Sequence, residues 1–143
     1  MYEAVVDTNI YVRAFLKPDS SDGKIIHLAV DDEITIYYSR TSFQELLKVL
    51  RYARLKKYGV TDEKIEVYLR LISEVGKLVS PAIRFVLSRD PSDNEFLSIA
   101  ASVAESAGTY LISADKDLLV LNGKIENVNI LTPQNFLKKI YKS

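Results

Sequence analysis

The chain has 143 residues, of which 48% are hydrophobic and 27% charged, with 19 basic side chains, 19 acidic side chains and no cysteine. Its length suits a single domain, residues 1–143, with one sizeable core, and the lack of cysteine excludes disulfides, thiolate zinc sites and cysteine nucleophiles. No apolar run approaches the roughly 18 residues that a membrane helix needs, so we expect a cytoplasmic protein, and because the formal net charge is zero, nucleic acid would have to bind at a local patch.

Strand-like and helix-like segments alternate in the first half of the chain. The runs YEAVVD and EITIYYS are apolar and β-rich, and they predict strands at residues 2–7 and 33–39. Apolar residues at helical spacing predict helices at residues 8–16, 22–30, 40–59 and 61–76. Gly59 and Gly76 end the last two helices, and Thr61 caps the second of them. The following run, residues 77–88, is irregular, with a strand expected on one or both sides of Pro81.

The second half continues the alternation. Asp90 is expected to cap a helix that has Pro91 at its first position and ends near Gly108. Strands are expected at residues 109–113 and 126–132, with a short helical turn at 114–121 and a closing helix at 133–143. Strands that alternate with helices pair in parallel and have both faces covered. The sequence therefore predicts a three-layer α/β/α fold with a mostly parallel central sheet.

Four acids follow four separate strand regions. They are Asp7, Glu45, Asp93 and Asp115. In open parallel sheets, ligands bind beyond the carboxyl ends of the strands, where the strand order reverses, so these acids should meet at one edge. Each also has a structural explanation alone, since Asp93 could favour a helix N-terminus, Asp115 could lie in a solvated turn and Glu45 could be a surface residue.

A cluster of acids at this edge would need cations. Two carboxylates about 5 Å apart repel by roughly 3 kcal/mol at an effective dielectric constant of about 20, and an all-oxygen site suits Mg²⁺ or Mn²⁺. The polar neighbours Asn9, Ser113 and Asp117 are candidates to orient the carboxylates or bound waters. Such ions activate water and stabilise charge on phosphate, which makes hydrolysis of phosphodiester bonds the favoured reaction.

Four motifs resemble the PIN domain family in order and spacing. They are VVDTN, ELLKVL, RDPSDNEFL and YLISADKDLL, and the resemblance extends from Val5 to about Thr132. More narrowly, the chain resembles the prokaryotic group of toxin components of toxin–antitoxin systems related to VapC. The resemblance implies a Mg²⁺- or Mn²⁺-dependent endoribonuclease that cleaves RNA, has a protein antitoxin as partner and forms a homodimer. Its catalytic, metal-binding acids fall on Asp7, Glu45, Asp93 and Asp115.

One position departs from the family pattern. Where relatives often have a further aspartate after the third acid, this chain has Asn94, which leaves Asp90 and Asp93 as alternatives for the third acid. Cations expected near the acidic edge, and therefore candidates to bind phosphate, are Arg13, Arg40 and Lys116. A basic run, RYARLKKYG, could grip phosphates and stack bases on its tyrosines, or could simply complement a helix dipole.

Other functions remain open at this point. A receiver-type switch would need an acidic pair after the first strand, and a phosphatase of the haloacid dehalogenase type would need an aspartate where Asn9 stands. Both of these Mg²⁺-dependent alternatives are disfavoured. A catalytically silent PIN-like module that binds a partner is the remaining alternative.

Overall fold

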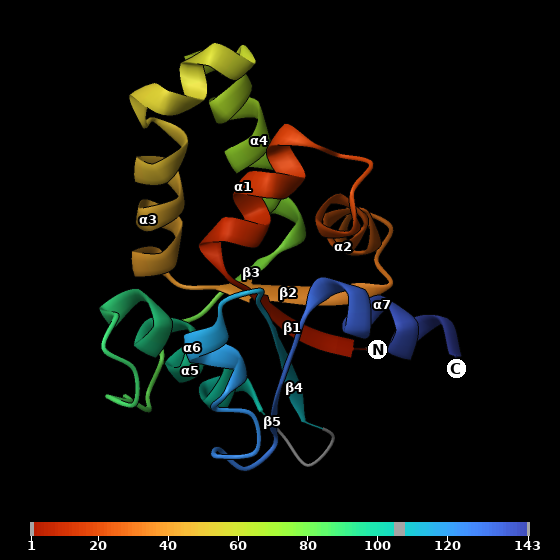
Figure 1. The fold of residues 1–143 in the computed structure, drawn as a ribbon, viewed down its shortest axis with the longest axis vertical. Coiled ribbons are helices and arrows are strands. Elements are labelled where there is room, and N and C mark those ends of the chain that lie inside the picture. Colours follow the sequence, from red (N-terminus) through yellow and green to blue (C-terminus); the bar gives the residue numbers. More distant parts are fainter. Residues whose placement is uncertain (1, 105–107, 143) are drawn as a thin grey trace.

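The computed structural model describes residues 2–104 and 108–142. Within this part of the chain, five strands form one sheet in the order β3-β2-β1-β4-β5, and every neighbouring pair is parallel (Figure 1). The strands are β1 (Tyr2–Val6), β2 (Ile34–Tyr38), β3 (Lys77–Leu78), β4 (Thr109–Ile112) and β5 (Val128–Leu131). The chain moves from β1 to one side of the sheet for β2 and β3, and returns to the other side for β4 and β5. The strand order therefore reverses between β1 and β4.

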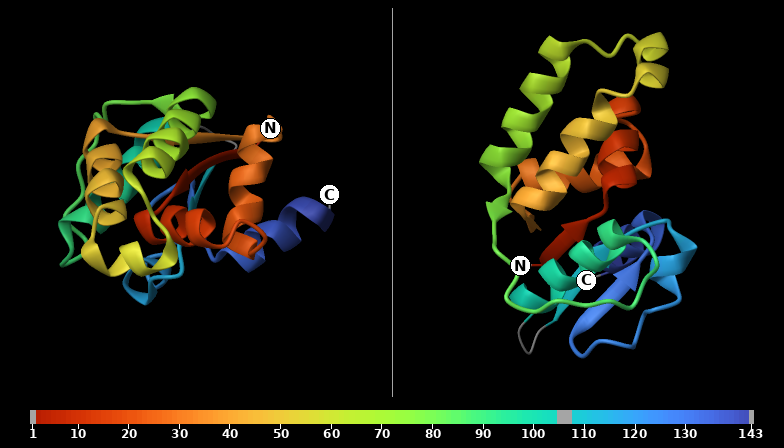
Figure 2. Two further views of the ribbon diagram at one scale, coloured as in Figure 1. Left: turned by 90° about the horizontal axis from the view of Figure 1, so that it is seen from above. Right: turned by 90° about the vertical axis from the view of Figure 1, so that its left-hand side faces the viewer.

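Helices connect the strands and cover both faces of the sheet. They are α1 (Thr8–Leu16), α2 (Ser21–Val30), α3 (Arg40–Leu50), the 3₁₀ helix η1 (Ala53–Tyr58), α4 (Asp62–Val75), α5 (Pro91–Val103), α6 (Lys116–Leu119) and α7 (Pro133–Lys142). Helices α5 and α6 pack on the face opposite to the one covered by α1 and α2 (Figures 1 and 2). The expected three-layer α/β/α fold with a parallel sheet is confirmed.

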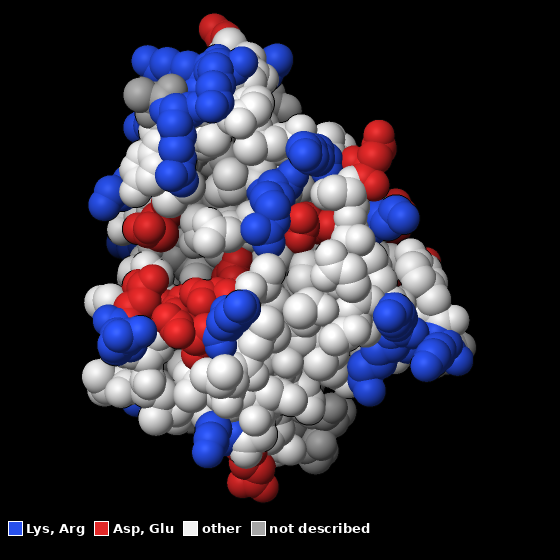
Figure 3. All heavy atoms as spheres, viewed as in Figure 1, with Lys and Arg blue, Asp and Glu red and all other residues white. Residues whose placement is uncertain are grey.

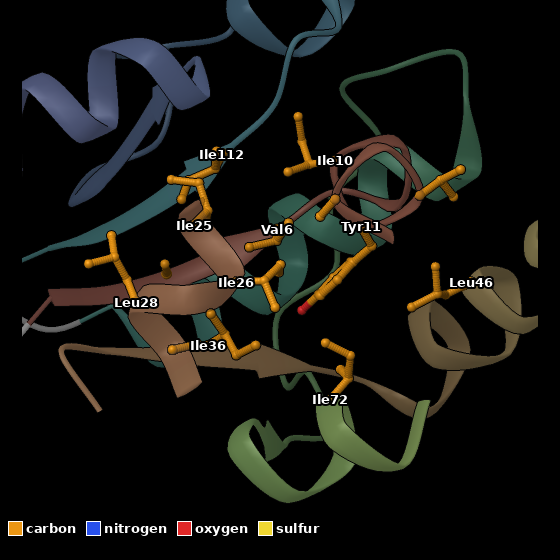
Figure 4. Packing of buried hydrophobic residues seen from close by; sticks show 14 of the residues in the cluster. Val6, Ile10, Tyr11, Ile25, Ile26, Leu28, Ile36, Leu46, Ile72 and Ile112 are labelled. Atoms are coloured by element: carbon orange, nitrogen blue, oxygen red, sulfur yellow. The ribbon is translucent and has the colours of Figure 1, made fainter. Parts of the chain in front are cut away.

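Strand residues alternate between two hydrophobic clusters. Val6 of β1 points into the larger cluster, with Ile10, Ile25, Ile36 and Ile112 (Figure 4). Val5, one position earlier, points into the smaller cluster, which α5 and α6 cover. Because strand side chains alternate between faces, one apolar run serves both clusters, which explains why the first strand reads as continuously hydrophobic. Among the described residues, no helix is both long and apolar enough to cross a membrane.

The helix expected at residues 40–59 is wrong in its extent. Helix α3 ends at Leu50, Tyr52 adopts extended backbone angles, and η1 follows. A continuous helix would have turned Arg54 and Lys57 toward the core, one and two turns beyond Leu50, where burying their charge is costly. The break instead buries Leu55, which is 5% exposed. The helix begins at Arg40 as expected, with Ser39 as its N-cap.

Three other segments compare with their expected bounds as follows. Helix α2 begins at Ser21 with Ser20 as its N-cap, one residue before the expected start. The irregular run at 77–88 forms one strand, the two-residue β3, which lies before Pro81 and agrees with the expectation of a strand on at least one side of that residue. Helix α5 ends at Val103, and residues 105–107, which the expected end near Gly108 would include, lie outside the described part.

Gly23 gives a direct test of the packing of α2. A Cβ atom at this position would lie 1.9 Å from the backbone oxygen of Pro18, so Gly23→Ala should lower the free energy of unfolding by about 2–4 kcal/mol. Gly123→Ala is the control. Position 123 has a positive φ of 88° but no atom within 4 Å of the added Cβ, so only about 1 kcal/mol should be lost. Equal losses in urea denaturation would contradict the close approach of α2 to Pro18.

Candidate active site

A cleft of about 220 Å³ lies beyond the carboxyl ends of the strands. Its acidic lining residues, within the described chain, are Asp7, Glu45, Asp90, Asp93 and Asp115. They follow β1, β2, β3 and β4 in the chain, so separate connections converge at the reversal of strand order. Figure 3 shows acidic side chains gathered in a hollow on this face of the molecule. The four acids expected from the sequence therefore line one cleft, together with Asp90.

Asp7 is the most enclosed acid of the cleft. It is 5% exposed and serves as the N-cap of α1, where its Oδ1 accepts a hydrogen bond from the Ile10 N–H at 3.0 Å. The Ser113 hydroxyl donates a hydrogen bond to Oδ2. Burial raises the pKa of Asp7, whereas these two donors and the nearby charge of Arg13 lower it, and burial is the largest of these effects. Both carboxylate oxygens are thus fixed in orientation, but the charge is poorly compensated.

Ser113 joins the acids that follow β1 and β4. The register pairs Val6 with Ile112, so that Asp7 and Ser113 are neighbours across the two strands. The fully buried Ser113 hydroxyl also accepts a hydrogen bond from the Asp115 N–H at 2.9 Å. Asp115 in turn caps α6, where its Oδ1 accepts from the Asp117 N–H at 2.9 Å. One serine therefore fixes the separation of two cleft acids, the contact expected of it from the sequence.

Asp93 lies in the first turn of α5 and is also 5% exposed. Its pKa is raised from 3.8 to about 6, mainly by burial and then by the charges of Asp115, Asp90 and Asp7, against a hydrogen bond from the Ser88 hydroxyl at 3.1 Å. Asp90, by contrast, is exposed and accepts the Ser92 N–H at 2.9 Å as N-cap of the helix. Of the two alternatives for the third acid, Asp93 is the buried one.

Glu45 reaches the cleft from α3, whose N-terminus is held by side chains. Ser39 and Ser42 form a reciprocal capping box, with each hydroxyl bonded to the backbone at the other position. The Ser39 hydroxyl also donates to Glu95 on α5, and Glu95 accepts a hydrogen bond from Arg84 at 2.8 Å. These contacts tie α3 to α5, and Glu45 and Asp93 line the same cleft.

The donor set of the cleft fits a hydrated divalent cation. Among the described residues, no three acidic or histidine side chains converge closely enough to hold an ion by themselves. Mg²⁺, however, usually keeps several waters and is held by one or two carboxylates together with phosphate oxygens. Thr8 also lines the cleft, and its Oγ1 is buried without a hydrogen-bond partner in the described chain. Buried carboxylates with raised pKa values and an unpartnered hydroxyl suit such an ion.

The remaining residues expected from the sequence are placed less uniformly. Asn9 lines the cleft. Arg13 lies close enough to lower the pKa of Asp7, although its Nε donates to Asp22 at 3.1 Å. Three exposed residues are not among those lining the cleft, and these are Arg40, Lys116 and Asp117. The Asp117 carboxylate lies 3.9 Å from Arg89.

Other residues of the cleft were not expected from the sequence. Tyr52 and Arg54 line it, and Arg54 is the one cation among its described lining residues. The sequence reveals the basic run but not its position beside the acids. Asn94, where relatives often have an acid, bonds the backbone of Ser88 twice, through Oδ1 at 2.8 Å and Nδ2 at 2.9 Å. An amide suits this position because it both accepts and donates.

Comparisons with known proteins agree with this geometry. Residues 3–117 match the family model described as PIN domain. The chain is 29% identical over 147 residues to the uncharacterized protein MJ1680 of Methanocaldococcus jannaschii, covering 98% of this chain and 92% of that one. Its fold is similar to that of PAE2754 from Pyrobaculum aerophilum, with a TM-score of 0.53, 15% identity and coverage of 99% and 97%. It is also similar to the RRP44 PIN domain of T. brucei, with a TM-score of 0.50, 15% identity and coverage of 99% and 82%.

Asp93→Asn should stabilise the metal-free protein at neutral pH. Because the pKa of Asp93 rises from 3.8 to about 6, the folded state favours its protonated form, and the free energy of unfolding should fall as pH rises across this interval. In EDTA, the variant should therefore be more stable than wild type by about 1–3 kcal/mol at pH 7 and nearly equal at pH 4.

Thermal unfolding at both pH values measures this difference, with the exposed Asp19→Asn as control. Added Mg²⁺ should then raise the melting temperature of wild type more than that of Asp93→Asn. A wild type that is equally stable at pH 4 and pH 7 in EDTA, or equal Mg²⁺ shifts in both proteins, would contradict the electrostatics of this cleft.

Proposed function

This chain belongs to the PIN domain family, whose members are generally nucleases, and we propose that it is a Mg²⁺- or Mn²⁺-dependent endoribonuclease. The observation that carries the proposal is the convergence of Asp7, Glu45, Asp93 and Asp115 on one cleft at the reversal of strand order. Charge repulsion among these acids needs a cation, and the chain offers no cysteine and only one histidine as alternative catalytic groups.

Hydrogen bonds orient the carboxylates that would hold the ions. Asp93 and Asp115 each have one oxygen that accepts a hydrogen bond from the chain, from Ser88 and Asp117 respectively. Both oxygens of Asp7 accept one, from Ile10 and Ser113. These bonds fix the direction of each carboxylate before any ligand arrives, which lowers the cost of organising the site. When bound, Mg²⁺ or Mn²⁺ would lower the pKa of a water and stabilise charge on the phosphate. Glu45 would complete the site from the opposite wall.

Two further parts of the proposal concern the biological role. The resemblance of the four motifs to the VapC-related group supports RNA as the substrate and a role as the toxin of a toxin–antitoxin pair. A protein antitoxin would then be its partner, and a homodimer its assembly. The alternative, a silent PIN-like module, would have no need of carboxylates that burial leaves poorly compensated.

Asp7→Asn should abolish cleavage of RNA. The amide keeps the shape and can still accept from Ile10, but it lacks the charge that holds a divalent ion, so the rate should fall at least about 100-fold. The assay follows a labelled single-stranded RNA with Mg²⁺ or Mn²⁺, with EDTA as a second control. Asp19→Asn, on an exposed loop, should cleave like wild type. Equal cleavage by wild type and Asp7→Asn would indicate a contaminating nuclease and overturn the proposed activity.

Induced expression should arrest growth of a bacterial host if the chain is a toxin. Growth is followed by optical density, and Asp7→Asn, produced at the same level, should leave growth unchanged because the same cleft is responsible. Normal growth with wild-type protein that cleaves RNA in vitro would reject the toxin role and leave the ribonuclease activity standing.

A further inference from the structure

A basic strip follows α3, between Arg51 and Gly59. It contains four cations, two tyrosines and no acid, and its residues are Arg51, Tyr52, Arg54, Lys56, Lys57 and Tyr58. All six side chains are exposed. Within the described chain, none of the four cations forms a salt bridge with an acid. Because the molecule has zero net charge, a cluster of four cations without acidic partners calls for a functional explanation.

The dipole of α3 does not account for the strip as a whole. That effect falls off within the last turn of a helix, and of the strip only Arg51, the C-cap residue, adjoins the end of α3. Tyr52 then takes extended backbone angles, with φ −61° and ψ 136°. The 3₁₀ helix η1 carries the strip away from the sheet, at the end of the molecule where α3 and α4 meet (Figures 1 and 2).

The break after α3 places the start of the strip against the acidic cleft. Tyr52 and Arg54 both line the cleft that contains Asp7 and Glu45. Tyr52 is 37% exposed, so that much of its ring remains accessible. Figure 3 shows the same order on the surface, with basic side chains gathered over η1 and acidic side chains in the hollow below them. The strip and the cleft form one continuous surface.

Aromatic rings and cations are paired within the strip. The Arg54 guanidinium lies 5.3 Å from the centre of the Tyr52 ring, and the Lys57 ammonium lies 5.2 Å from that of Tyr58. An aromatic ring or a guanidinium plane offers a flat surface on which a base stacks, and the cation beside it contacts phosphate. Only an unpaired base exposes a face for such stacking.

From this placement we infer that the basic strip binds a single strand of RNA that enters the acidic cleft, with Tyr52 as the stacking platform next to the cleft and Arg54 as its phosphate contact. The inference rests on the proposed ribonuclease activity for the choice of RNA. It adds the residues that hold the strand beside the acids. The acids alone would repel a phosphate chain, so other groups must hold the strand.

Binding without cleavage tests this inference. Asp7→Asn serves as the parent, with Mg²⁺ present, and fluorescence anisotropy measures the Kd for a labelled single-stranded RNA of roughly 10 nucleotides. Adding Tyr52→Leu should weaken binding roughly 5- to 100-fold, whereas Tyr52→Phe should retain it because the ring remains. Tyr141→Leu, at a tyrosine of α7 that is 69% exposed, is the matched control and should bind like the parent.

The contact between Arg54 and phosphate is tested separately, by the salt dependence of binding. Arg54→Gln should reduce the slope of log Kd against log salt concentration by about 0.7, and Arg70→Gln, on the exposed face of α4, should leave the slope unchanged. Melting temperatures of all variants show that each is folded.

The outcomes separate the inference from the proposed activity. Equal Kd values for Tyr52→Leu, Tyr141→Leu and the parent would overturn the inferred role of the strip in binding RNA. Cleavage by wild type would be unaffected by that result. Tighter binding of duplex RNA, or of single-stranded DNA of the same sequence, would overturn the assignment to unpaired RNA. Binding that depends on Tyr52, in a chain whose wild type does not cleave, would support the strip and overturn the ribonuclease.

Discussion

The parallel pairing of β1 with β4 is the constraint on which the candidate site depends. Their register places Asp7 beside Ser113, and the Asp7 N–H donates to the Ile112 carbonyl at 3.1 Å. A shift of one residue would turn each strand side chain to the opposite face of the sheet, so the apolar alternation of Val5 and Val6 that fills both clusters also fixes where the acid lies. The burial of hydrophobic side chains therefore sets the geometry of the charged ones.

The same arrangement opposes stability in the absence of a cation. Burial raises the pKa values of Asp7 and Asp93, which means that the folded chain disfavours the ionised forms that neutral pH imposes. The two hydrophobic clusters must offset this cost, and a bound divalent ion would relieve it. Strain of this electrostatic kind is characteristic of functional sites, where groups are arranged for a ligand rather than for the fold alone.

The sequence predicts most of the fold and the acids, because these depend on local patterns. Apolar runs mark β1, β2, β4 and β5, and helix periodicity with caps marks the helices between them. The end of α3 depends instead on whether Leu55 or Arg54 turns inward, a choice decided by tertiary packing. Local patterns also fail to predict which cations line the cleft. Arg40 and Lys116 are near the acids in the chain, but the direction of a side chain is set by the turn that carries it, and the cleft is lined by Arg54.

The break after α3 also explains how a chain without net charge can present a surface for a polyanion. At a distance the 19 basic and 19 acidic side chains cancel, but salt screens charges beyond about 8–10 Å, so a strand in contact with the surface responds to the nearest side chains. The break after α3 separates the charged side chains by sign, with acids at the strand ends and cations along η1 (Figure 3). In the proposed activity, a phosphate chain would be held along η1 without a divalent ion and would reach the acids only where an ion can be bound. Substrate binding and metal binding would then take place on adjoining parts of one surface.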